Sequence, residues 1–407
     1  MKIKYCRVCK SNSFVKVFNL GNQVLTGVFP KKKNEKIDRG KLSMVFCKKC
    51  SLLQLEDSFN PIKIYGKNYG YMSSQNKSMI NHLKNKLSKI KKLANLKKGD
   101  FIIDIGSNDG TFLNFFSKKY NLIGIDPSAK RLRKYYRNDI KLKTDFFNYD
   151  LIKKNLSKKK AKIITTISMF YDLEDPIKFA QDIYKSLDDN GIWHLEQSYM
   201  PSMIQNTSYD TICHEHLEYY SLKSIKYIFD KVGFVIIDLD FNDINGGSFA
   251  ITVKKKSNKN YKHFHLTKWL LEKERVNKYN DYKTYYKFFK EVKKHKNDLK
   301  RLLVDLKRNK KKVFGYGAST KGNVILQFCK INSKLIPYVA DVSSFKYNKF
   351  TPGTKIKIIS EKKAHVLKPD YFLVLPWHFK DFIIKKEKKF LKNGGKFIFP
   401  LPEINIV

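Results

Sequence analysis

Residues 101–126 read FIIDIGSNDGTFLNFFSKKYNLIGID, and this stretch decides the fold. The apolar run FIIDIG predicts a strand that ends in a glycine turn, and the segment after the turn predicts a helix. Gly106 and Gly110 let the backbone approach a ligand closely, and the first turn of the helix favours a carboxylate or phosphate group. We therefore expect a small-molecule site at this turn.

A second apolar run ends in Asp126, twenty residues after Gly106. An acid at the end of the second strand of such a unit can accept hydrogen bonds from both ribose hydroxyls of a nucleoside. The glycine pattern is looser than G-x-G-x-x-G and is weak by itself. Together with Asp126, it predicts a site for a dinucleotide or for S-adenosylmethionine (SAM).

Further strand-like runs follow at 161–170, 191–200, 233–241 and 247–256, with helix-like segments between the earlier ones. This alternation predicts a doubly wound α/β sheet. The last two runs are joined by a short segment rich in Asn and Gly, which predicts an antiparallel hairpin at one edge. Such an ending favours a SAM-dependent methyltransferase, and an NAD-binding Rossmann domain is the alternative.

Four of the six cysteines form two C-x2-C pairs, Cys6 with Cys9 and Cys47 with Cys50. Two such pairs supply the four thiolates that a tetrahedral zinc ion takes in a structural site. Redox-active or free thiols are the alternative. Four cysteines leave no open position on the metal, so we expect the zinc to hold a small domain together rather than to act in catalysis.

A second strand, glycine turn and helix are predicted in KKVFGYGASTKGNVILQF, residues 311–328. Ser319, Thr320 and Lys321 stand where a phosphate would lie, so a second ligand, a nucleotide-linked substrate, is expected here. A turn that merely packs tightly is the alternative. We therefore expect an α/β protein with a zinc module at 1–62, a class I Rossmann-like methyltransferase domain at 63–255, a basic helical connector at 256–310 and a smaller Rossmann-like domain at 311–407.

The net charge is +45, from 82 Lys and Arg residues against 37 Asp and Glu. The excess is almost all lysine and is spread along the chain, whereas a nucleic-acid site would favour arginine and a basic patch. No apolar run is long enough to span a bilayer, and the first residues lack a signal sequence. We expect a cytoplasmic protein whose partner is a small nucleotide-sugar, with no nucleic acid and no membrane insertion; an RNA-modifying enzyme is the alternative.

The segment SYDTICHEHLEYYSL, residues 208–222, contains three adjacent titratable residues, His214, Glu215 and His216. Neighbours in the chain cannot all face one way, so we expect two of them to reach a site. A histidine oriented by a carboxylate is a competent general base near neutral pH. A metal site and ordinary packed histidines are the alternatives, although neither H-E-x-x-H nor a third ligand is evident.

The four-cysteine module, DIGSNDGTFL, CHEH, NGGS and GYGASTKGN together resemble the sugar C-methyltransferase family. That family acts on nucleotide-linked 4-keto-deoxysugars in antibiotic and surface-glycan pathways, and the resemblance covers essentially the whole chain. It implies zinc bound by the four paired cysteines and SAM bound at the 101–126 unit. It also implies three sets of residues: cofactor-binding Asp104, Gly106, Asn108, Gly110, Asp126 and Met169; catalytic His216, Glu215, His214 and Tyr71; substrate-binding Gly315, Tyr316, Gly317, Ser319, Thr320, Lys321 and Asn245.

The resemblance further implies that His216, oriented by Glu215, removes a proton from the carbon beside a ketone, and that the resulting enolate attacks the methyl group of SAM. Tyr71 or His214 would stabilise the enolate oxygen. The chain departs from the family at two positions: Cys213 replaces a tyrosine, and Tyr171 stands where some members have histidine. Methylation of a sugar hydroxyl on the same scaffold is the alternative.

Overall fold

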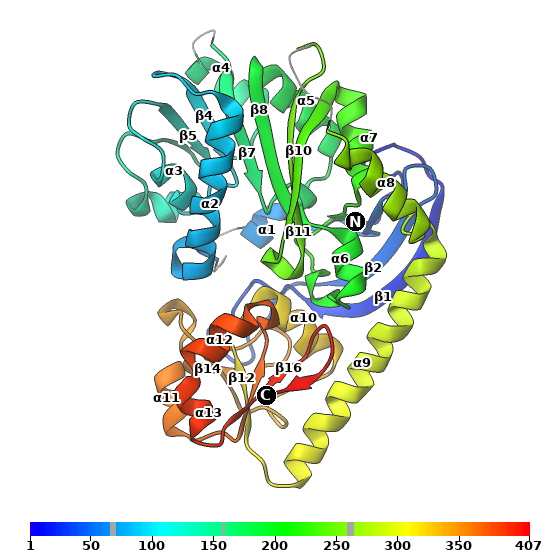
Figure 1. Ribbon diagram of the computed structural model, residues 1–407. Coiled ribbons are helices and arrows are strands. Elements are labelled where there is room, and N and C mark those ends of the chain that lie inside the picture. The colour runs from blue at the N-terminus through cyan, green and yellow to red at the C-terminus, as the bar shows by residue number, and fades with distance from the viewer. Residues whose placement is uncertain (66–70, 157–158, 259–263) are drawn as a thin grey trace.

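The computed structural model describes residues 1–65, 71–156, 159–258 and 264–407. Three sheets account for the strands, and helices cover the faces of the two larger ones (Figure 1). The seven-stranded sheet occupies one end of the molecule and the six-stranded sheet the other, with the four-stranded sheet beside the join. The expected α/β fold with a four-cysteine cluster is confirmed.

The N-terminal part forms a four-stranded antiparallel sheet in the order β1-β2-β3-β9. Its strands are β1 (Phe14–Val24), β2 (Arg39–Cys47), β3 (Leu53–Leu55) and β9 (Glu218–Tyr219). The short helix α1 (Pro61–Tyr65) follows this part of the chain. The fourth strand comes from the middle of the chain, where Glu218 pairs with Gln54. The CHEH segment therefore runs directly into the sheet of the cysteine module.

The central sheet has the order β10-β11-β8-β7-β4-β5-β6. Its strands are β4 (Phe101–Ile105), β5 (Asn121–Ile125), β6 (Lys141–Lys143), β7 (Ala161–Ile167), β8 (Leu187–Ser198), β10 (Phe234–Asn242) and β11 (Ser248–Lys255). The strands from β4 to β8 are parallel, whereas β11 is antiparallel to both β8 and β10. The predicted antiparallel hairpin at the sheet edge is therefore present.

Local signals in the sequence set the ends of the helices around this sheet. These helices are α2 (Lys77–Ala94), α3 (Thr111–Asn114), α4 (Tyr149–Leu156), α5 (Pro176–Ser186), α6 (Met200–Gln205) and α7 (Leu222–Val232). Asn76 caps α2, Asp175 caps α5 just before a proline, and Ser221 caps α7 in a capping box. An oxygen side chain at each of these positions satisfies backbone N–H groups that the helix itself leaves free.

Two helices, α8 (Leu266–Val276) and α9 (Tyr282–Arg308), connect the central sheet to the C-terminal unit. The buried side chains of α9 recur every three to four residues along one face: Tyr285, Phe288, Val292, His295, Leu299 and Leu303. Lysines occupy the other face, which explains how a strongly basic segment still forms a stable amphipathic helix. None of the helices in the described ranges is long and apolar enough to cross a membrane.

The C-terminal sheet has the order β14-β13-β12-β15-β16-β17, parallel except for β17. Its strands are β12 (Val313–Tyr316), β13 (Tyr338–Asp341), β14 (Lys357–Ser360), β15 (Tyr371–Val374), β16 (Lys396–Phe399) and β17 (Asn405–Ile406). Its helices are α10 (Thr320–Phe328), α11 (Glu361–Val366), α12 (Lys380–Lys386) and α13 (Lys388–Lys392). The glycine turn of GYGASTKGN lies between β12 and α10, as expected for a Rossmann-like unit.

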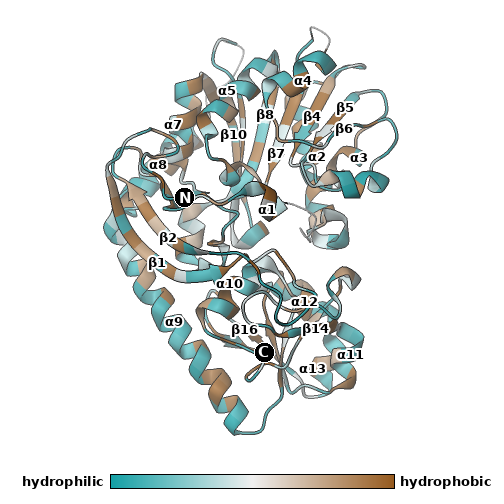
Figure 2. Ribbon diagram, turned by 180° about the vertical axis from the view of Figure 1, so that it is seen from behind, coloured by the Kyte–Doolittle hydropathy of each residue, from teal (hydrophilic) through white to brown (hydrophobic). Residues whose placement is uncertain are grey.

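The N-terminal sheet packs against both larger units. Hydrophobic residues are frequent along the strands of the central sheet (Figure 2). Phe18 of β1 stacks on the side of α9, with ring centroids 5.7 Å from Phe288 and 5.4 Å from Phe289. The cysteine end packs instead into the core of the central sheet, in one apolar cluster with Trp193 and Tyr220. The cysteine module thus contacts the two units that the sequence assigns to cofactor and substrate.

Candidate active site

The four paired cysteines converge on one point. Their sulfur atoms all lie within 4.8 Å of one another, with Cys6 Sγ 3.6 Å from Cys50 Sγ and Cys9 Sγ 3.5 Å from Cys47 Sγ. Four thiolates at about 2.3 Å from a tetrahedral zinc ion lie roughly 3.8 Å apart, so the cluster fits zinc.

Each cysteine pair is shaped by the same backbone turn. Lys10 N donates to Cys6 O at 3.0 Å, and Ser51 N donates to Cys47 O at 2.9 Å. Lys10 and Ser51 both have positive φ, 57° and 62°. The two turns aim their sulfurs at the same volume, and the four-thiolate set leaves no position for a substrate, as in structural zinc sites.

The turn after β4 has the geometry that the glycine pattern predicts. Gly106 has φ +74°, and a Cβ there would lie 3.0 Å from Met169 Cγ. Asn108 N donates to Asp126 Oδ2 at 2.9 Å, which couples the turn to the acid at the end of β5. Asp126 Oδ1 in turn accepts from Ser128 N at 2.7 Å. These contacts fix the carboxylate at the carboxyl end of the sheet, where the adenosyl ribose of SAM would bind.

Asp104 lies under this turn as the last acid of β4 and is buried. Thr165 Oγ1 donates to its Oδ1 at 2.5 Å. Burial raises the pKa of Asp104 to about 7, and the nearby Asp126 adds to the effect. A cationic ligand above the turn, such as the sulfonium of SAM, would favour the charged form of this carboxyl group.

Tyr71 begins a short segment that lies against the same turn. Asn108 Nδ2 donates to the carbonyl of Tyr71 at 3.3 Å, and Ser73 N donates to Asn108 Oδ1 at 3.0 Å. Ser74 N similarly donates to Asp109 at 2.9 Å. The Tyr71 residue is 44% exposed, so the structure brings the Tyr-x-Ser-Ser element to the expected cofactor turn with the tyrosine still accessible.

The three side chains of the CHEH segment point to different neighbours. His214 is buried against the N-terminal sheet, with Nε2 3.3 Å from Gly40 O and its ring at the edge of Phe59. Glu215 points toward residues 26–27, where a Cβ on Gly27 would lie 2.8 Å from Glu215 Oε1. His216 alone lies beside Tyr171, with ring centroids 4.2 Å apart. The structure therefore does not bring His214 together with His216.

A backbone carbonyl holds one nitrogen of His216. Nδ1 lies 2.7 Å from Thr211 O, and a carbonyl can only accept, so Nδ1 carries the proton in the neutral ring. Among the described residues Nε2 has no hydrogen-bond partner. Desolvation lowers the pKa of His216 to about 3, and the charge of Lys321 acts in the same direction. The imidazole is thus neutral, with an available lone pair on Nε2. Thr211, rather than Glu215, makes the orienting contact.

The turn of the C-terminal unit repeats the hydrogen bonds of the turn after β4. Ala318 N donates to Asp341 Oδ2 at 2.7 Å, and Ser343 N donates to Asp341 Oδ1 at 2.8 Å. These bonds match those that Asn108 and Ser128 make to Asp126. Ser319 caps α10, where its side chain accepts from Gly322 N. The repeated hydrogen bonds are compatible with the nucleotide-binding turn that the sequence predicts here.

The start of α10 meets the central domain next to His216. Lys321 Nζ donates to Asn245 O at 2.6 Å, and Asn245 Nδ2 donates to Ser168 Oγ at 3.2 Å. Burial lowers the pKa of Lys321, and the carboxylate of Asp210 acts in the opposite direction. Lys321 and Asn245 therefore stand at the junction of the two units.

Other predicted residues of the C-terminal turn serve packing in this structure. The hydroxyl of Tyr316 donates to Glu387 Oε1 at 2.9 Å, on the side of the sheet where Lys386 also contacts it. Gly315 and Gly317 are required for close approach, because a Cβ would lie 2.8 Å from Val339 and 2.6 Å from Pro376. These three residues shape the turn, and among the described residues none of their contacts is with His216.

Sequence reasoning missed polar residues at the same junction. Asp210 is fully buried and accepts from Trp377 Nε1 at 2.8 Å, which ties the segment before His216 to the C-terminal unit. Burial lowers the pKa of His378 to about 3, and the charge of Lys321 again contributes. Asp210 and Trp377 lie far apart in the chain, so no spacing pattern marks them.

Comparisons with known proteins match three consecutive parts of the chain. A zinc binding domain family matches residues 6–65, a methyltransferase domain family 76–239, and the family described as C-methyltransferase C-terminal domain 243–402. The C-methyltransferase NovU of Streptomyces niveus is 27% identical over 412 residues, covering 100% of this chain and 97% of NovU.

Two further proteins are similar to part of the chain. Carboxy-S-adenosyl-L-methionine synthase of Nautilia profundicola is 34% identical over 107 residues, covering 25% of this chain and 46% of the synthase. The solved structure of a SAM-dependent methyltransferase from Clostridium acetobutylicum is 13% identical with a TM-score of 0.33, covering 43% of this chain and 92% of that one.

The strand order of the central sheet, the turn at Gly106 and the methyltransferase domain match define the class of protein. The chain is a SAM-dependent methyltransferase with a structural zinc module. Within that class it is similar in domain order to C-methyltransferases: three consecutive domain matches end in the C-methyltransferase C-terminal domain, and NovU aligns from end to end.

Proposed function

We propose that this enzyme methylates the carbon next to the ketone of a nucleotide-linked deoxysugar. One observation carries the proposal: His216 is held as a neutral ring by Thr211 O, with its Nε2 lone pair available, at the junction of two nucleotide-type turns. A carbon beside a ketone is acidic enough for a positioned imidazole to deprotonate, whereas an ordinary ring carbon is not.

The two turns have separate roles in this proposal. The turn at Gly106, with Asp126, holds SAM, which supplies an electrophilic methyl group when bound. The start of α10, with Ser319, Thr320 and Lys321, holds the diphosphate, because a helix N-terminus and an ammonium group both favour anions. The sugar then lies between the turns, beside His216.

His216 Nε2 takes the proton from the carbon next to the ketone, and the electron pair of that C–H bond becomes the enolate double bond. The enolate oxygen needs a positive or hydrogen-bonding group nearby. With cysteine at position 213, Lys321 is the cation whose charge reaches both Cys213 and His216. Bound SAM would supply the methyl group to the enolate carbon, and the electron pair of the broken carbon–sulfur bond would stay on sulfur.

In this proposal Glu215 does not contact the imidazole ring of His216 and instead helps to hold the loop that carries it. Its carboxylate faces the segment at 26–27, and Thr26 Oγ1 donates to it at 3.4 Å. Asn323 of α10 donates to Thr26 O at 2.8 Å, so this acid borders the expected substrate turn. We propose that Glu215 fixes the loop that carries His216 against that turn.

The experiment is incubation of the purified zinc-loaded enzyme with SAM and a panel of nucleotide-linked 4-keto-deoxysugars. Mass spectrometry should show the gain of one methylene group, and NMR should place the new methyl group on a carbon next to the ketone. A methyl group on a hydroxyl oxygen would contradict the proposal and favour O-methylation on this scaffold. Methyl transfer to RNA and not to any sugar would contradict it more broadly.

A further inference from the structure

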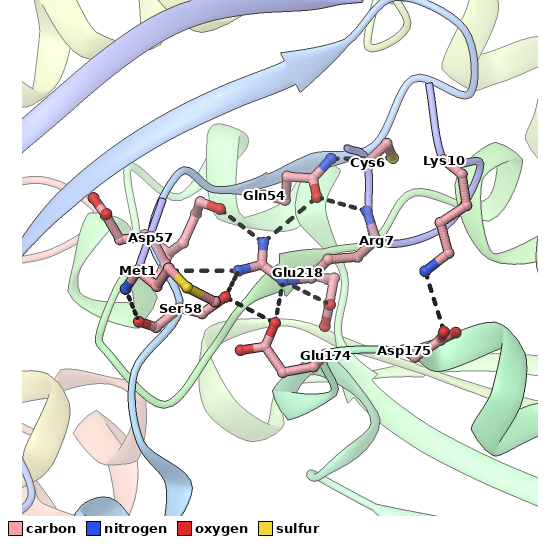
Figure 3. A network of polar contacts seen from close by, with 11 residues as sticks. Met1, Cys6, Arg7, Lys10, Gln54, Asp57, Ser58, Glu174, Asp175 and Glu218 are labelled. Carbon is pink, nitrogen blue, oxygen red and sulfur yellow. Dashed lines mark hydrogen bonds and ion pairs between the residues drawn. The ribbon is translucent and has the colours of Figure 1, made fainter. Parts of the chain in front are cut away.

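Arg7 lies inside the first cysteine pair, but its guanidinium group points away from the sulfurs into the joint with the central domain (Figure 3). Its side chain is 2% exposed. The group donates to Leu55 O at 2.7 Å, to Ser58 Oγ at 3.0 Å and to Glu174 Oε2 at 3.3 Å. So many directed contacts fix the guanidinium and leave it no freedom to follow a displaced partner.

Arg7 is also the cation placed beside a buried acid. Glu218 Oε1 lies 3.7 Å from Arg7 Nε, and the Glu218 side chain is fully buried. Burial raises the pKa of Glu218 well above its usual value, and Arg7 acts in the opposite direction. Neither carboxyl oxygen of Glu218 has a hydrogen-bond partner among the described residues, so Arg7, which stays charged, acts on Glu218 through its charge and its packing.

Glu218 begins the strand β9, two residues after His216. In β9 it pairs with Gln54, and Leu55 N donates to Leu217 O at 2.9 Å. Leu217 N in turn donates to Tyr171 O at 2.7 Å, and Tyr171 packs on the imidazole.

Glu174, the other acid that Arg7 contacts, lies three residues after Tyr171. Arg7 therefore contacts both segments that enclose His216, one through Glu218 and the other through Glu174.

Gln54 links this network to the metal ligands. Its Nε2 donates to Cys6 Sγ at 3.2 Å, and its Oε1 accepts from Arg7 N at 3.2 Å (Figure 3). A zinc-bound thiolate is a good acceptor, so metal binding would fix the Gln54 amide and with it the backbone of Arg7. The path from sulfur to the strand of His216 therefore consists of directly contacting groups.

We propose that Arg7 is a positioning residue that transmits the order of the zinc site to the imidazole of His216. This inference rests on the proposed role of His216 as the base, and it gives the zinc module a part in catalysis beyond holding its own fold. Loss of Arg7 then misplaces the imidazole while the zinc and SAM sites remain formed. A displacement of about 1 Å in a reacting group can cost on the order of 100-fold in rate.

The test compares Arg7→Met with Lys10→Met. The side chain of Lys10 pairs with Asp175 on the same loop of the central domain, but that pair is exposed and 3.1 Å long. Only the backbone of Lys10 takes part in the turn of the first cysteine pair, so the substitution keeps its bond to Cys6 O. Both variants are checked for bound zinc and for SAM affinity by calorimetry. Arg7→Met should lower kcat by roughly 10- to 100-fold with a much smaller change in KM, and Lys10→Met should stay within about twofold of the wild type.

A second readout does not depend on turnover. Nitrogen-15 NMR of histidine-labelled protein reports which nitrogen of His216 carries the proton, with His216→Gln used for assignment. The wild type should show the Nδ1-protonated form, and both Arg7→Met and chelator-treated wild type should show a mixture. If the proposed function is wrong but this inference is right, the NMR change remains while sugar turnover is absent.

If Arg7→Met does not fold, the double variant Arg7→Met/Glu218→Gln removes the buried charge and keeps the test available. If Arg7 positions His216, the double variant should fold and bind zinc. It should still have the low kcat and a mixture of His216 tautomers. Wild-type kcat and a single tautomer in a zinc-loaded Arg7 variant, single or double, would overturn the inference.

Discussion

The ammonium group of Lys321 donates to the backbone carbonyl of Asn245 at 2.6 Å and so joins the start of α10 to the hairpin between β10 and β11. This bond holds a positive charge near His216, whose pKa it helps to lower. The same charge can meet an anionic diphosphate or a developing enolate. In the proposed function, the position of Lys321 between the two units would connect substrate binding to proton removal.

Replacement of Lys321 by Met should raise the pKa of His216, because removal of a nearby cation favours the protonated ring. The acid limb of the pH profile of kcat/KM, which reports the free enzyme, should therefore move to higher pH. Lys307→Met is the control, since Lys307 also donates to a carbonyl, Lys334 O at 2.8 Å, but is itself exposed on the lysine-rich face of α9. An unshifted acid limb in Lys321→Met would contradict the electrostatic role.

Replacement of Gly106 by Ala should weaken SAM binding. The residue has φ +74°, and the new Cβ would lie 3.0 Å from Met169 Cγ, so the turn must move. Gly99→Ala is the matched control, because Gly99 has φ +84° and a Cβ added there would have no neighbour within 4 Å among the described residues. Both variants carry backbone strain of roughly 1–2 kcal/mol, but only Gly106→Ala should lose affinity, by about tenfold or more in calorimetry. Equal affinities would place SAM elsewhere.

The repeated acids Asp126 and Asp341 allow the two turns to be tested separately. Asp126→Asn should reduce SAM affinity by roughly 10- to 100-fold, about 1.4–2.8 kcal/mol, because a charged acceptor for the ribose hydroxyls is lost. Asp341→Asn should leave SAM affinity near the wild-type value and weaken the nucleotide-sugar instead. Calorimetry with each ligand measures both effects. A loss of SAM binding in Asp341→Asn would reverse the proposed roles of the two units.

The stability of the fold should depend on pH through His194. Burial lowers the pKa of His194 to about 3, below its usual value near 6.5. The unfolded chain then binds more protons between these values, so the neutral buried ring contributes stability above about pH 6.5 that is lost as pH falls toward 3. Between pH 7.5 and 5.5 this amounts to about 1.4 kcal/mol.

His194→Asn keeps a polar group toward Thr252, which His194 Nδ1 contacts at 2.9 Å, but removes the titration. Urea unfolding of each protein is measured at pH 7.5 and at pH 5.5. Between these pH values, the free energy of unfolding of His194→Asn should fall by about 1.4 kcal/mol less than that of the wild type. The same drop in both proteins would show that His194 is already accessible to protons in the folded state.

Short-range patterns in the sequence predicted the parts of the structure that depend on local spacing. The two C-x2-C pairs, the turn from Gly106 to Asp126 and the edge hairpin each lie within a few dozen residues, or in a motif whose ligand geometry fixes the spacing. These elements are present as expected.

Long-range contacts escaped prediction because nothing in the local sequence encodes them. The strand at Glu218 is two residues long and pairs with Gln54, far away in the chain. The partner of His216 Nδ1 is a backbone carbonyl, and every residue has one, so the sequence does not indicate which carbonyl it is. Arg7 is one basic residue in a lysine-rich chain, and its burial and its partners are determined only by the folded structure.

The central claim is that His216 Nε2 removes the proton next to the ketone. The most direct measurement is the uptake of deuterium from solvent at that carbon, with enzyme present and SAM withheld, followed by NMR. Rapid exchange with the wild type and a loss of about 100- to 10,000-fold in His216→Ala, with SAM affinity intact, is the predicted result. Exchange at the wild-type rate in His216→Ala, or no exchange on a sugar that the wild type methylates, would contradict it.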